Sequence, residues 1–236
     1  MHKIQIKQAW TDVERCQNCA IRHLVLFSDL QLKDFEHIHK PIDEIQYKLG
    51  DVVYNQNEDM QFVYTIRSGL VKLVQNLPGG RVRIVRILGK GDLLGIESLN
   101  SQLTEHTAIS LDKVDLCRIP HSVITSLQYN SPRLHKALIV RWQKTLAMAD
   151  LWITQLSTGK IKCRVARLLL LLDKKYESES FLMPTREDIG LMLGITTESV
   201  SKTTAEFKRK QWLIISKDNR ATLDVKALDH LCSDHV

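Results

Sequence analysis

The hydrophobic pattern of this chain changes its period near the middle, and that change limits the possible folds more than any other feature. Between residues 42 and 120, short alternating apolar runs are separated by glycines, which is typical of a compact antiparallel β domain. From Ser131-Pro132 onward the spacing becomes helical, with Ser131 as the expected cap and Pro132 in the first turn. The 236 residues are enough for one large domain or two modest ones. The change of period favours an α+β chain in two parts.

The clearest local signal in the β region is a hairpin. Apolar-alternating runs at 71–74 and 82–85 flank the turn-forming segment Asn76-Leu77-Pro78-Gly79-Gly80. Proline and glycine clustered between two such runs predict two antiparallel strands joined by a tight connection.

The helical region begins with one long helix over residues 131–157. Its apolar residues alternate at four- and three-residue spacing and form a single stripe, a pattern typical of a coiled-coil seam. The same helix packed on its own β domain is the alternative, but two tryptophans on one stripe favour a second copy as the partner. The predicted dimer seam consists of Leu138, Trp142, Thr145, Ala149, Trp152 and Leu156.

Residues 185–213 predict two short helices joined by a glycine turn. Thr185-Arg186-Glu187-Asp188 has the form of a capping box, and Gly194 permits a sharp turn before a second helix that Thr196 or Thr197 caps. Residues 212–225 then suit a hairpin wing. An ordinary helical corner is the alternative, but a polar outer face on the second helix favours a winged helix-turn-helix.

That outer face carries side chains suited to reading DNA. Glu198 can accept from a cytosine amino group, Ser201 can donate or accept, and Lys202 can donate to guanine. The basic residues that follow can lie against phosphates. The predicted DNA-binding residues are Thr197, Glu198, Ser201, Lys202, Lys208 and Arg209, with Lys210 next to them.

Composition and charge favour an anionic partner and argue against a membrane-spanning or secreted protein. The formal net charge of +6 and the pI near 9.0 favour nucleic acid, although this signal is weak alone. No apolar run is long enough for a membrane span, and the N-terminus does not have the pattern of a signal peptide. We therefore expect a cytoplasmic protein whose five cysteines are not a structural disulfide set. No catalytic constellation is visible, so we do not expect an enzyme.

Taken in order, these segments resemble the Crp/Fnr family of bacterial transcription regulators, closest to the Fnr branch. The resemblance covers nearly the whole chain. In the β region it rests on Tyr64-Thr65-Ile66-Arg67-Ser68-Gly69-Leu70-Val71-Lys72 and Gly91-Asp92-Leu93-Leu94-Gly95. In the helical region it rests on Glu187-Asp188-Ile189-Gly190 through Glu198-Ser199-Val200-Ser201-Lys202. Each motif is moderately specific, whereas their order and spacing together are very specific.

The resemblance implies a cyclic-nucleotide-binding-type β-roll, a long dimerisation helix and a C-terminal winged helix-turn-helix. The corresponding divisions are an N-terminal cysteine segment at 1–30, a sensor domain at 31–130, the dimerisation helix at 131–157 and the DNA-binding domain at 158–236. It also implies a homodimer on palindromic double-stranded DNA, and RNA polymerase as a partner of an activator. The hairpin at 76–83 is the implied polymerase-contacting surface.

The family pattern also indicates how a half-site would be read. The Fnr branch uses Glu, Ser and Arg at E-x-x-S-R, and here the string is Glu198, Ser201 and Lys202. Lysine lacks the bidentate fork that arginine presents to guanine. An Fnr-like half-site with a weakened guanine contact is therefore expected.

The resemblance places the family's cyclic AMP site at Gly95-Ile96-Glu97 and His106-Thr107-Ala108. Crp-type proteins hold the cyclic phosphate with an arginine, and this chain has His106 at that position. The loss of a charge-assisted donor weakens any hold on a buried phosphate, so cyclic AMP is not expected. The resemblance to the Fnr branch favours a regulator that responds to oxygen or redox state. The alternative is a β-roll that binds a small molecule other than cyclic AMP, or a regulator that responds to no signal.

Fnr-type proteins sense oxygen through an iron–sulfur cluster held by three N-terminal cysteines and one in the β-roll. Cys16 and Cys19 match the first pair, and Cys117 before Ile119-Pro120 matches the distal ligand. Val25 stands at the third N-terminal position, so one thiolate of the usual four is missing. The resemblance thus indicates a candidate iron–sulfur cluster on Cys16, Cys19 and Cys117.

Other interpretations of these cysteines stay open. The Cys16/Cys19 pair has the spacing of a zinc half-site or a redox dithiol, and Cys117 also suits a small core residue. Cys163 and Cys232 match no ligand position of the family and are expected to be structural or incidental.

Overall fold

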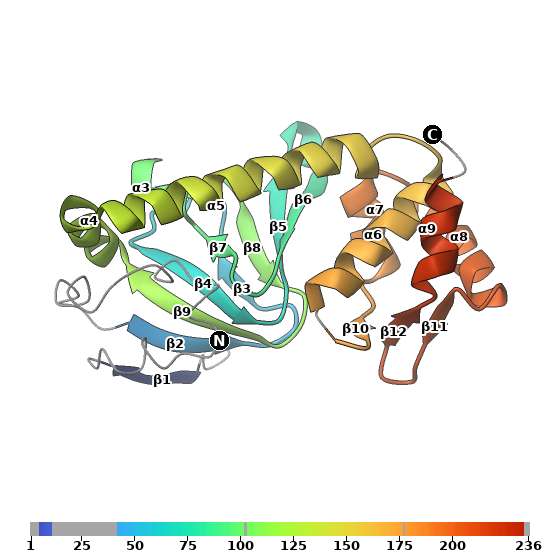
Figure 1. The fold of residues 1–236 in the computed structure, drawn as a ribbon, viewed down its shortest axis with the longest axis horizontal. Helices are drawn as coiled ribbons and strands as arrows, with labels where there is room; N and C mark the ends of the chain where they lie inside the picture. The colour runs from blue at the N-terminus through green and yellow to red at the C-terminus, as the bar shows by residue number, and fades with distance from the viewer. Residues whose placement is uncertain (1–4, 11–41, 102, 177, 234–236) are drawn as a thin grey trace. The chain divides into compact units, whose positions relative to one another are not determined.

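A computed structural model describes residues 5–10, 42–101, 103–176 and 178–233. The chain divides into two compact units (Figure 1). Unit 1 comprises residues 1–76 and 87–145, and unit 2 comprises residues 77–86 and 146–236.

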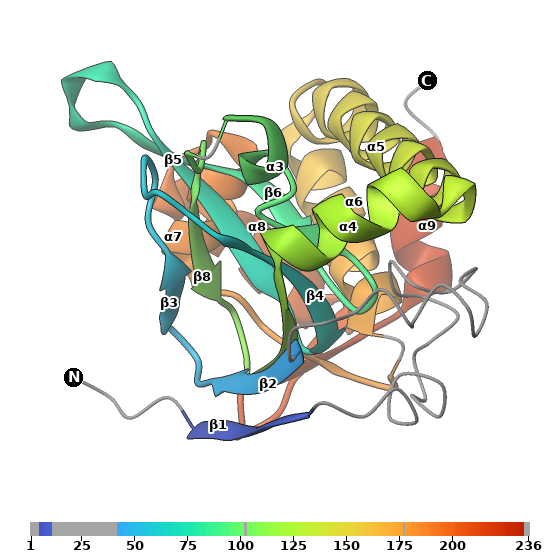
Figure 2. The same ribbon diagram turned by 90° about the vertical axis from the view of Figure 1, so that its left-hand side faces the viewer.

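The strands of the N-terminal half form two antiparallel sheets. One has the order β1-β2-β9-β4-β7 and the other the order β3-β8-β5-β6. Figure 2 shows β3 and β8 on one side of this roll and β4 on another. The strands are β1 (Gln5–Trp10), β2 (Ile42–Tyr47), β3 (Val52–Tyr54), β4 (Phe62–Ser68), β5 (Val71–Asn76), β6 (Val82–Leu88), β7 (Leu93–Leu94), β8 (Thr107–Ser110) and β9 (Val114–Pro120).

The predicted hairpin is confirmed as β5 and β6, with a short 3-10 turn, η2 (Pro78–Gly80), between them. Pro78, Gly79, Gly80 and Arg81 at its tip are all exposed. Gly79 has a φ of 80°, a left-handed conformation that glycine adopts without steric cost. The turn chemistry of the sequence therefore sets this connection.

In the described part of unit 1 and its continuation, three helices follow the strands or lie between them. They are α3 (Ser98–Ser101), α4 (His121–Asn130) and α5 (Pro132–Leu151), and α5 continues as a π-helical turn, η3 (Trp152–Leu156). The first half of α5 is held by an apolar cluster in which Leu134, Ala137 and Leu138 pack with Ile124 and Leu127 of α4. The long helix expected over 131–157 is thus present, and one of its faces is buried against its own chain.

Unit 2 is built from four helices of the described chain and a small sheet of order β10-β12-β11. Val165, Leu168, Leu169 and Leu172 of the first helix are buried. The elements are α6 (Ile161–Tyr176), β10 (Phe181–Leu182), α7 (Arg186–Leu193), α8 (Thr197–Arg209), β11 (Leu213–Ile215), β12 (Arg220–Leu223) and α9 (Val225–Ser233). The α9 helix was not anticipated from the sequence; it packs against α6.

The corner between α7 and α8 depends on two glycines. Gly194 ends α7 with a φ of 64°, in the left-handed region. Gly190, inside α7, lies so close to the turn that an added Cβ would be 2.8 Å from the carbonyl oxygen of Ile195. The missing side chain at Gly190 is what lets the turn fold back onto α7.

We predict that Gly190→Ala lowers the free energy of unfolding of unit 2 by about 1–3 kcal/mol, because the new methyl group must displace the Ile195 carbonyl. Helix propensity alone would act in the opposite direction, since alanine in a helix interior is favoured over glycine by roughly 1 kcal/mol. Urea denaturation of wild type and variant measures the difference. Equal or greater stability of the variant would show that the turn can shift to accommodate the methyl group without loss of folding free energy.

Candidate nucleic-acid interface and sensor region

The α7–α8 corner is held by side-chain caps at the start of both helices. The Thr185 hydroxyl accepts a hydrogen bond from the Asp188 backbone N–H at 3.0 Å, as the capping-box motif predicted. The Thr196 hydroxyl accepts from the Ser199 backbone N–H at 3.2 Å. Of the two caps proposed for α8, Thr196 is therefore the one observed, and Thr197 is the first helical residue.

The α8 helix has one buried and one exposed face. Val200, Thr203, Thr204 and Phe207 are buried. Thr197, Glu198 and Lys202 are exposed and Ser201 is half-buried, so these four share the outer face near the N-terminal half of the helix. The Ser201 hydroxyl donates to the Thr197 carbonyl at 2.8 Å, which leaves its lone pairs able to accept from a base.

The C-terminal end of α8 is basic and anchored. Glu206 accepts from Lys162 of α6 at 2.7 Å and from Lys210 at 3.3 Å, and these bonds lower the pKa of its carboxyl group. The Lys210 ammonium also lies 4.3 Å from the centroid of the Trp212 ring, at the start of the wing. Lys208 and Arg209 extend outward and are exposed. Their charges suit phosphate contacts, whereas the Lys210 charge is already engaged.

The predicted wing is confirmed as the β11–β12 hairpin. The turn that joins its strands contains Asn219 with a φ of 57°, and its side-chain amide donates to the Met183 carbonyl at 2.9 Å. Lys217 in this turn is exposed. Two capped helices, an outward polar face and a basic-tipped wing can together place side chains in a major groove and cations along the adjoining phosphates.

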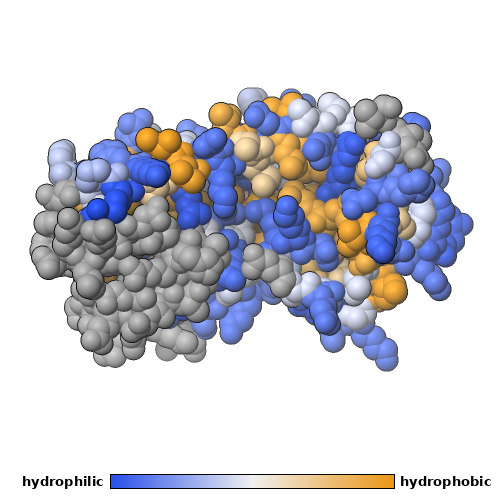
Figure 3. Space-filling view, viewed as in Figure 1, coloured by the Kyte–Doolittle hydropathy of each residue, from blue (hydrophilic) through white to orange (hydrophobic). Residues whose placement is uncertain are grey.

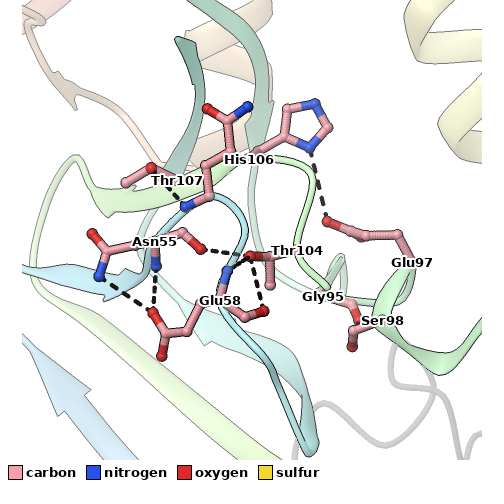
Figure 4. Close-up of polar contacts among 9 residues, drawn as sticks. Asn55, Glu58, Gly95, Glu97, Ser98, Thr104, His106 and Thr107 are labelled. Atoms are coloured by element: carbon pink, nitrogen blue, oxygen red, sulfur yellow. Dashed lines mark hydrogen bonds and ion pairs between the residues drawn. The ribbon is translucent and has the colours of Figure 1, made fainter. Parts of the chain in front are cut away.

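The region that the resemblance assigned to a small ligand lies in unit 1 and is drawn in Figure 4. His106 and Glu97 point toward each other, with His106 Nδ1 3.8 Å from Glu97 Oε1 and side-chain exposures of 7% and 12%. Nearby, the Thr104 hydroxyl accepts from the Glu58 backbone N–H at 3.0 Å and donates to the Asn55 carbonyl. The carboxylate of Glu97 is therefore the group that His106 faces.

This arrangement differs at one residue type from the site that the resemblance implies for a cyclic phosphate. Glu97 is present, but the side chain that faces it is His106. The charge-assisted arginine fork that holds such groups is replaced by a histidine. The residues at this position therefore disfavour a cyclic nucleotide as the ligand of the β-roll.

Of the three predicted cluster ligands, only Cys117 lies within the described residues; Cys16 and Cys19 lie outside them. Cys117 is on β9, opposite Glu44 of β2 and Thr65 of β4, and it packs against the apolar cluster that also holds α5. Within the described part of the chain, no three His, Cys, Asp or Glu side chains are grouped as a metal site would require. The predicted donor set of three thiols is one short of the four that usually hold an iron–sulfur cluster.

The predicted seam residues share one face of the helix, but the structure buries some of them and leaves others accessible. Leu138, Trp152 and Leu156 are buried in the chain itself, so the prediction that they face a partner is wrong. Trp142 is 51% exposed, and Thr145 and Ala149 are half-buried. The predicted stripe thus contains residues that pack on their own chain and residues that stay accessible, and an apolar stripe does not by itself indicate which surface covers each position.

A second apolar stripe lies beside the first. Ile139, Leu146 and Ile153 are 65%, 65% and 63% exposed, and with Trp142 and Ala149 they alternate at three- and four-residue spacing. We call these five residues the α5 stripe. Figure 3 shows apolar side chains interrupting the hydrophilic surface along the course of α5. The α5 stripe shares Trp142 and Ala149 with the predicted seam, and each of its other three residues follows a predicted seam residue by one position.

Comparison with known proteins follows the same division of the chain. Residues 44–129 match the family model described as the cyclic nucleotide-binding domain, and residues 163–232 match that of the Crp-like helix-turn-helix domain. The "Anaerobic regulatory protein" of Haemophilus influenzae is 26% identical over 206 residues, covering 82% of this chain and 78% of that protein.

Solved structures show the same architecture. TTHA1359, a transcriptional regulator of the CRP/FNR family from Thermus thermophilus, is 25% identical with a TM-score of 0.66, covering 82% of this chain and 100% of that one. The chain belongs to the Crp/Fnr family. FixK2 from Bradyrhizobium japonicum, 23% identical, has the same fold with a TM-score of 0.72 over 80% of this chain and 96% of that one.

Membership of this family makes the chain a DNA-binding transcription regulator and not an enzyme. The α+β class and the winged helix-turn-helix expected from the sequence are confirmed. Among the described residues, none of the helices combines the length and the apolar character that a bilayer span requires.

Proposed function

We propose that this Crp/Fnr regulator acts as a homodimer on a palindromic site, reads each half-site with α8, and responds to oxygen through its N-terminal cysteines. The observation that carries the DNA-reading part is the outward set of Glu198, Ser201 and Lys202 on a helix capped at Thr196. Contact with RNA polymerase through the exposed tip at 76–83 is part of the same proposal and rests on the family resemblance.

The proposed dimer forms through the α5 stripe, with a second copy of this chain as its partner. Large apolar side chains that are half to two-thirds exposed gain roughly 1.5–3 kcal/mol each when fully buried, so the stripe favours association. Its alternating spacing is that of a two-stranded coiled coil, in which each residue meets its own copy across the two-fold axis. Two-fold symmetry would then place two α8 helices in successive major grooves.

We predict that Leu146→Asp converts the dimer into a monomer at micromolar concentration, because two carboxylates would meet in the apolar seam. Sedimentation equilibrium measures the change. Lys144→Asp is the matched control, since Lys144 lies on the opposite side of α5 and is exposed, and it should leave the dimer intact. If Leu146→Asp remains dimeric, the α5 stripe is not the seam.

Base reading is expected to depend on Glu198. We predict that Glu198→Ala weakens binding to the specific palindrome by about 1–3 kcal/mol per half-site and changes binding to random DNA little. Arg209→Ala is the comparison, because a lost phosphate contact weakens binding to all sequences and flattens the salt dependence. Fluorescence anisotropy with both DNAs at several salt concentrations separates the two. Equal losses on specific and random DNA for Glu198→Ala would remove it from base reading.

The proposed oxygen response rests on the Cys16/Cys19 pair and on similarity to a protein described as an anaerobic regulator. A metal held by few thiolates, or a dithiol, is open to oxidation. The second candidate is a regulator that responds to a small molecule other than cyclic AMP or to none. The buried Glu97–His106 contact favours it, because both side chains can hydrogen-bond a neutral polar group.

We predict that wild-type protein prepared without oxygen binds DNA more tightly than the same protein exposed to air, and that Cys16→Ala removes this difference. Iron and zinc assays on the anaerobic protein distinguish a cluster, a zinc site and a metal-free dithiol. If wild type and Cys16→Ala each bind DNA equally well with and without air, the oxygen response is wrong. The second candidate, a regulator that responds to another small molecule or to none, would then replace it.

A further inference from the structure

Two cysteines that the sequence separates widely are brought together in unit 2. Cys163 lies in the first turn of α6 and is 3% exposed, while Cys232 lies in the last turn of α9 and is half-buried. They are 69 residues apart in the chain. The packing of α9 against α6, seen in Figure 1, is what joins the two turns.

The contacts between these turns are reciprocal. The Cys163 thiol lies 3.5 Å from the Leu231 carbonyl oxygen, and the Cys232 thiol lies 3.7 Å from the carbonyl oxygen of Cys163. Each sulfur therefore reaches the backbone of the other cysteine's segment. Burial raises the pKa of the Cys232 thiol, and the neighbouring Cys163 thiol raises it further. Both residues are thiols in this structure.

We propose that Cys163 and Cys232 are a reversible redox pair that closes an intramolecular disulfide between α6 and α9. The oxidant is a low-molecular-weight disulfide, RSSR. The Cys232 thiolate, the more accessible of the two, attacks one sulfur of RSSR and releases RS⁻. The Cys163 thiolate then attacks the Cys232 sulfur of the mixed disulfide and releases the second RS⁻. Two protein thiols and RSSR thus give one protein disulfide and two RSH.

The position of the pair gives the bond a defined effect on the DNA-binding unit. The closed loop contains α7, α8 and both strands of the wing, so the disulfide restricts the unfolded chain across the whole helix-turn-helix. Oxidation would therefore make the folded DNA-binding unit more stable. The bond joins the ends of α6 and α9 and involves no residue of the outer face of α8.

The surroundings of Cys232 set the rate of the first step. Burial keeps its pKa above the ordinary value, and Asp229 also raises it, while Arg167 lowers it. Little thiolate is present at neutral pH, so exchange is slow there and becomes faster as the pH rises toward this pKa. The pair would respond to sustained oxidation, and its response is independent of the proposed function of Cys16 and Cys19.

The test uses the full-length chain with Cys16, Cys19 and Cys117 each changed to Ser, which leaves only the proposed pair. The protein is incubated with oxidised glutathione at neutral and at mildly alkaline pH, then alkylated, digested and analysed by mass spectrometry. We expect one cross-linked peptide containing Cys163 and Cys232, formed severalfold faster at the higher pH. Alkylation of both cysteines after this treatment, glutathione attached to both, or cross-linked dimers would overturn the proposal.

Cys163→Ala is the matched variant. In this variant the reaction should stop at the mixed disulfide on Cys232, because the second thiol that releases glutathione is missing. A thermal scan of oxidised and reduced samples of the parent protein needs no further substitution. We expect the Tm of the oxidised sample to be at least about 5 °C higher. An unchanged Tm would show that the disulfide does not stabilise this unit.

Discussion

Packing of α4 against the start of α5 is the contact on which the geometry of the long helix depends. Ile124 and Leu127 are fully buried with Leu134, and this cluster includes Ile119 at the end of β9. One face of α5 is thereby committed to its own chain, and helical geometry then determines which residues point the other way. Ile139, Trp142, Leu146 and Ile153 are exposed because Leu134, Ala137 and Leu138 are not. The proposed dimer seam is a consequence of this intrachain packing.

The helix-turn-helix depends on a different kind of constraint, which is the close approach of backbones. Gly190 admits the Ile195 carbonyl, and Gly194 supplies a left-handed turn. With the turn set in this way, burial of Val200 and Phe207 orients α8, and Glu198 and Lys202 are left outward. The ion pair of Glu206 with Lys162 then ties the far end of α8 to α6, and Lys210, which also pairs with Glu206, lies over the Trp212 ring at the start of the wing. The side chains proposed to read bases are thus held on a rigid element, which specific recognition requires.

The β-roll keeps the architecture of a nucleotide-binding domain while its chemistry differs. At the position where the resemblance places a phosphate-binding arginine, a buried histidine faces Glu97, while residues 44–129 match the cyclic nucleotide-binding domain. A fold can carry several kinds of signal because the site resides in a few side chains and the architecture in the packing. Similarity to a cyclic nucleotide-binding domain is therefore compatible with a regulator whose proposed signal is oxygen.

The sequence by itself determined the local features, because these depend on neighbouring residues. The Thr185 cap, the Pro78–Gly80 turn, the glycine corner and the inward positions of α8 all follow from short-range backbone and side-chain chemistry. Only the tertiary structure decided which apolar residues of α5 are buried in the chain and which stay exposed, since periodicity groups residues into faces without stating what covers each position. It also brought Cys163 beside Cys232, because the packing of α9 on α6 joins residues whose separation in the chain carries no local signal.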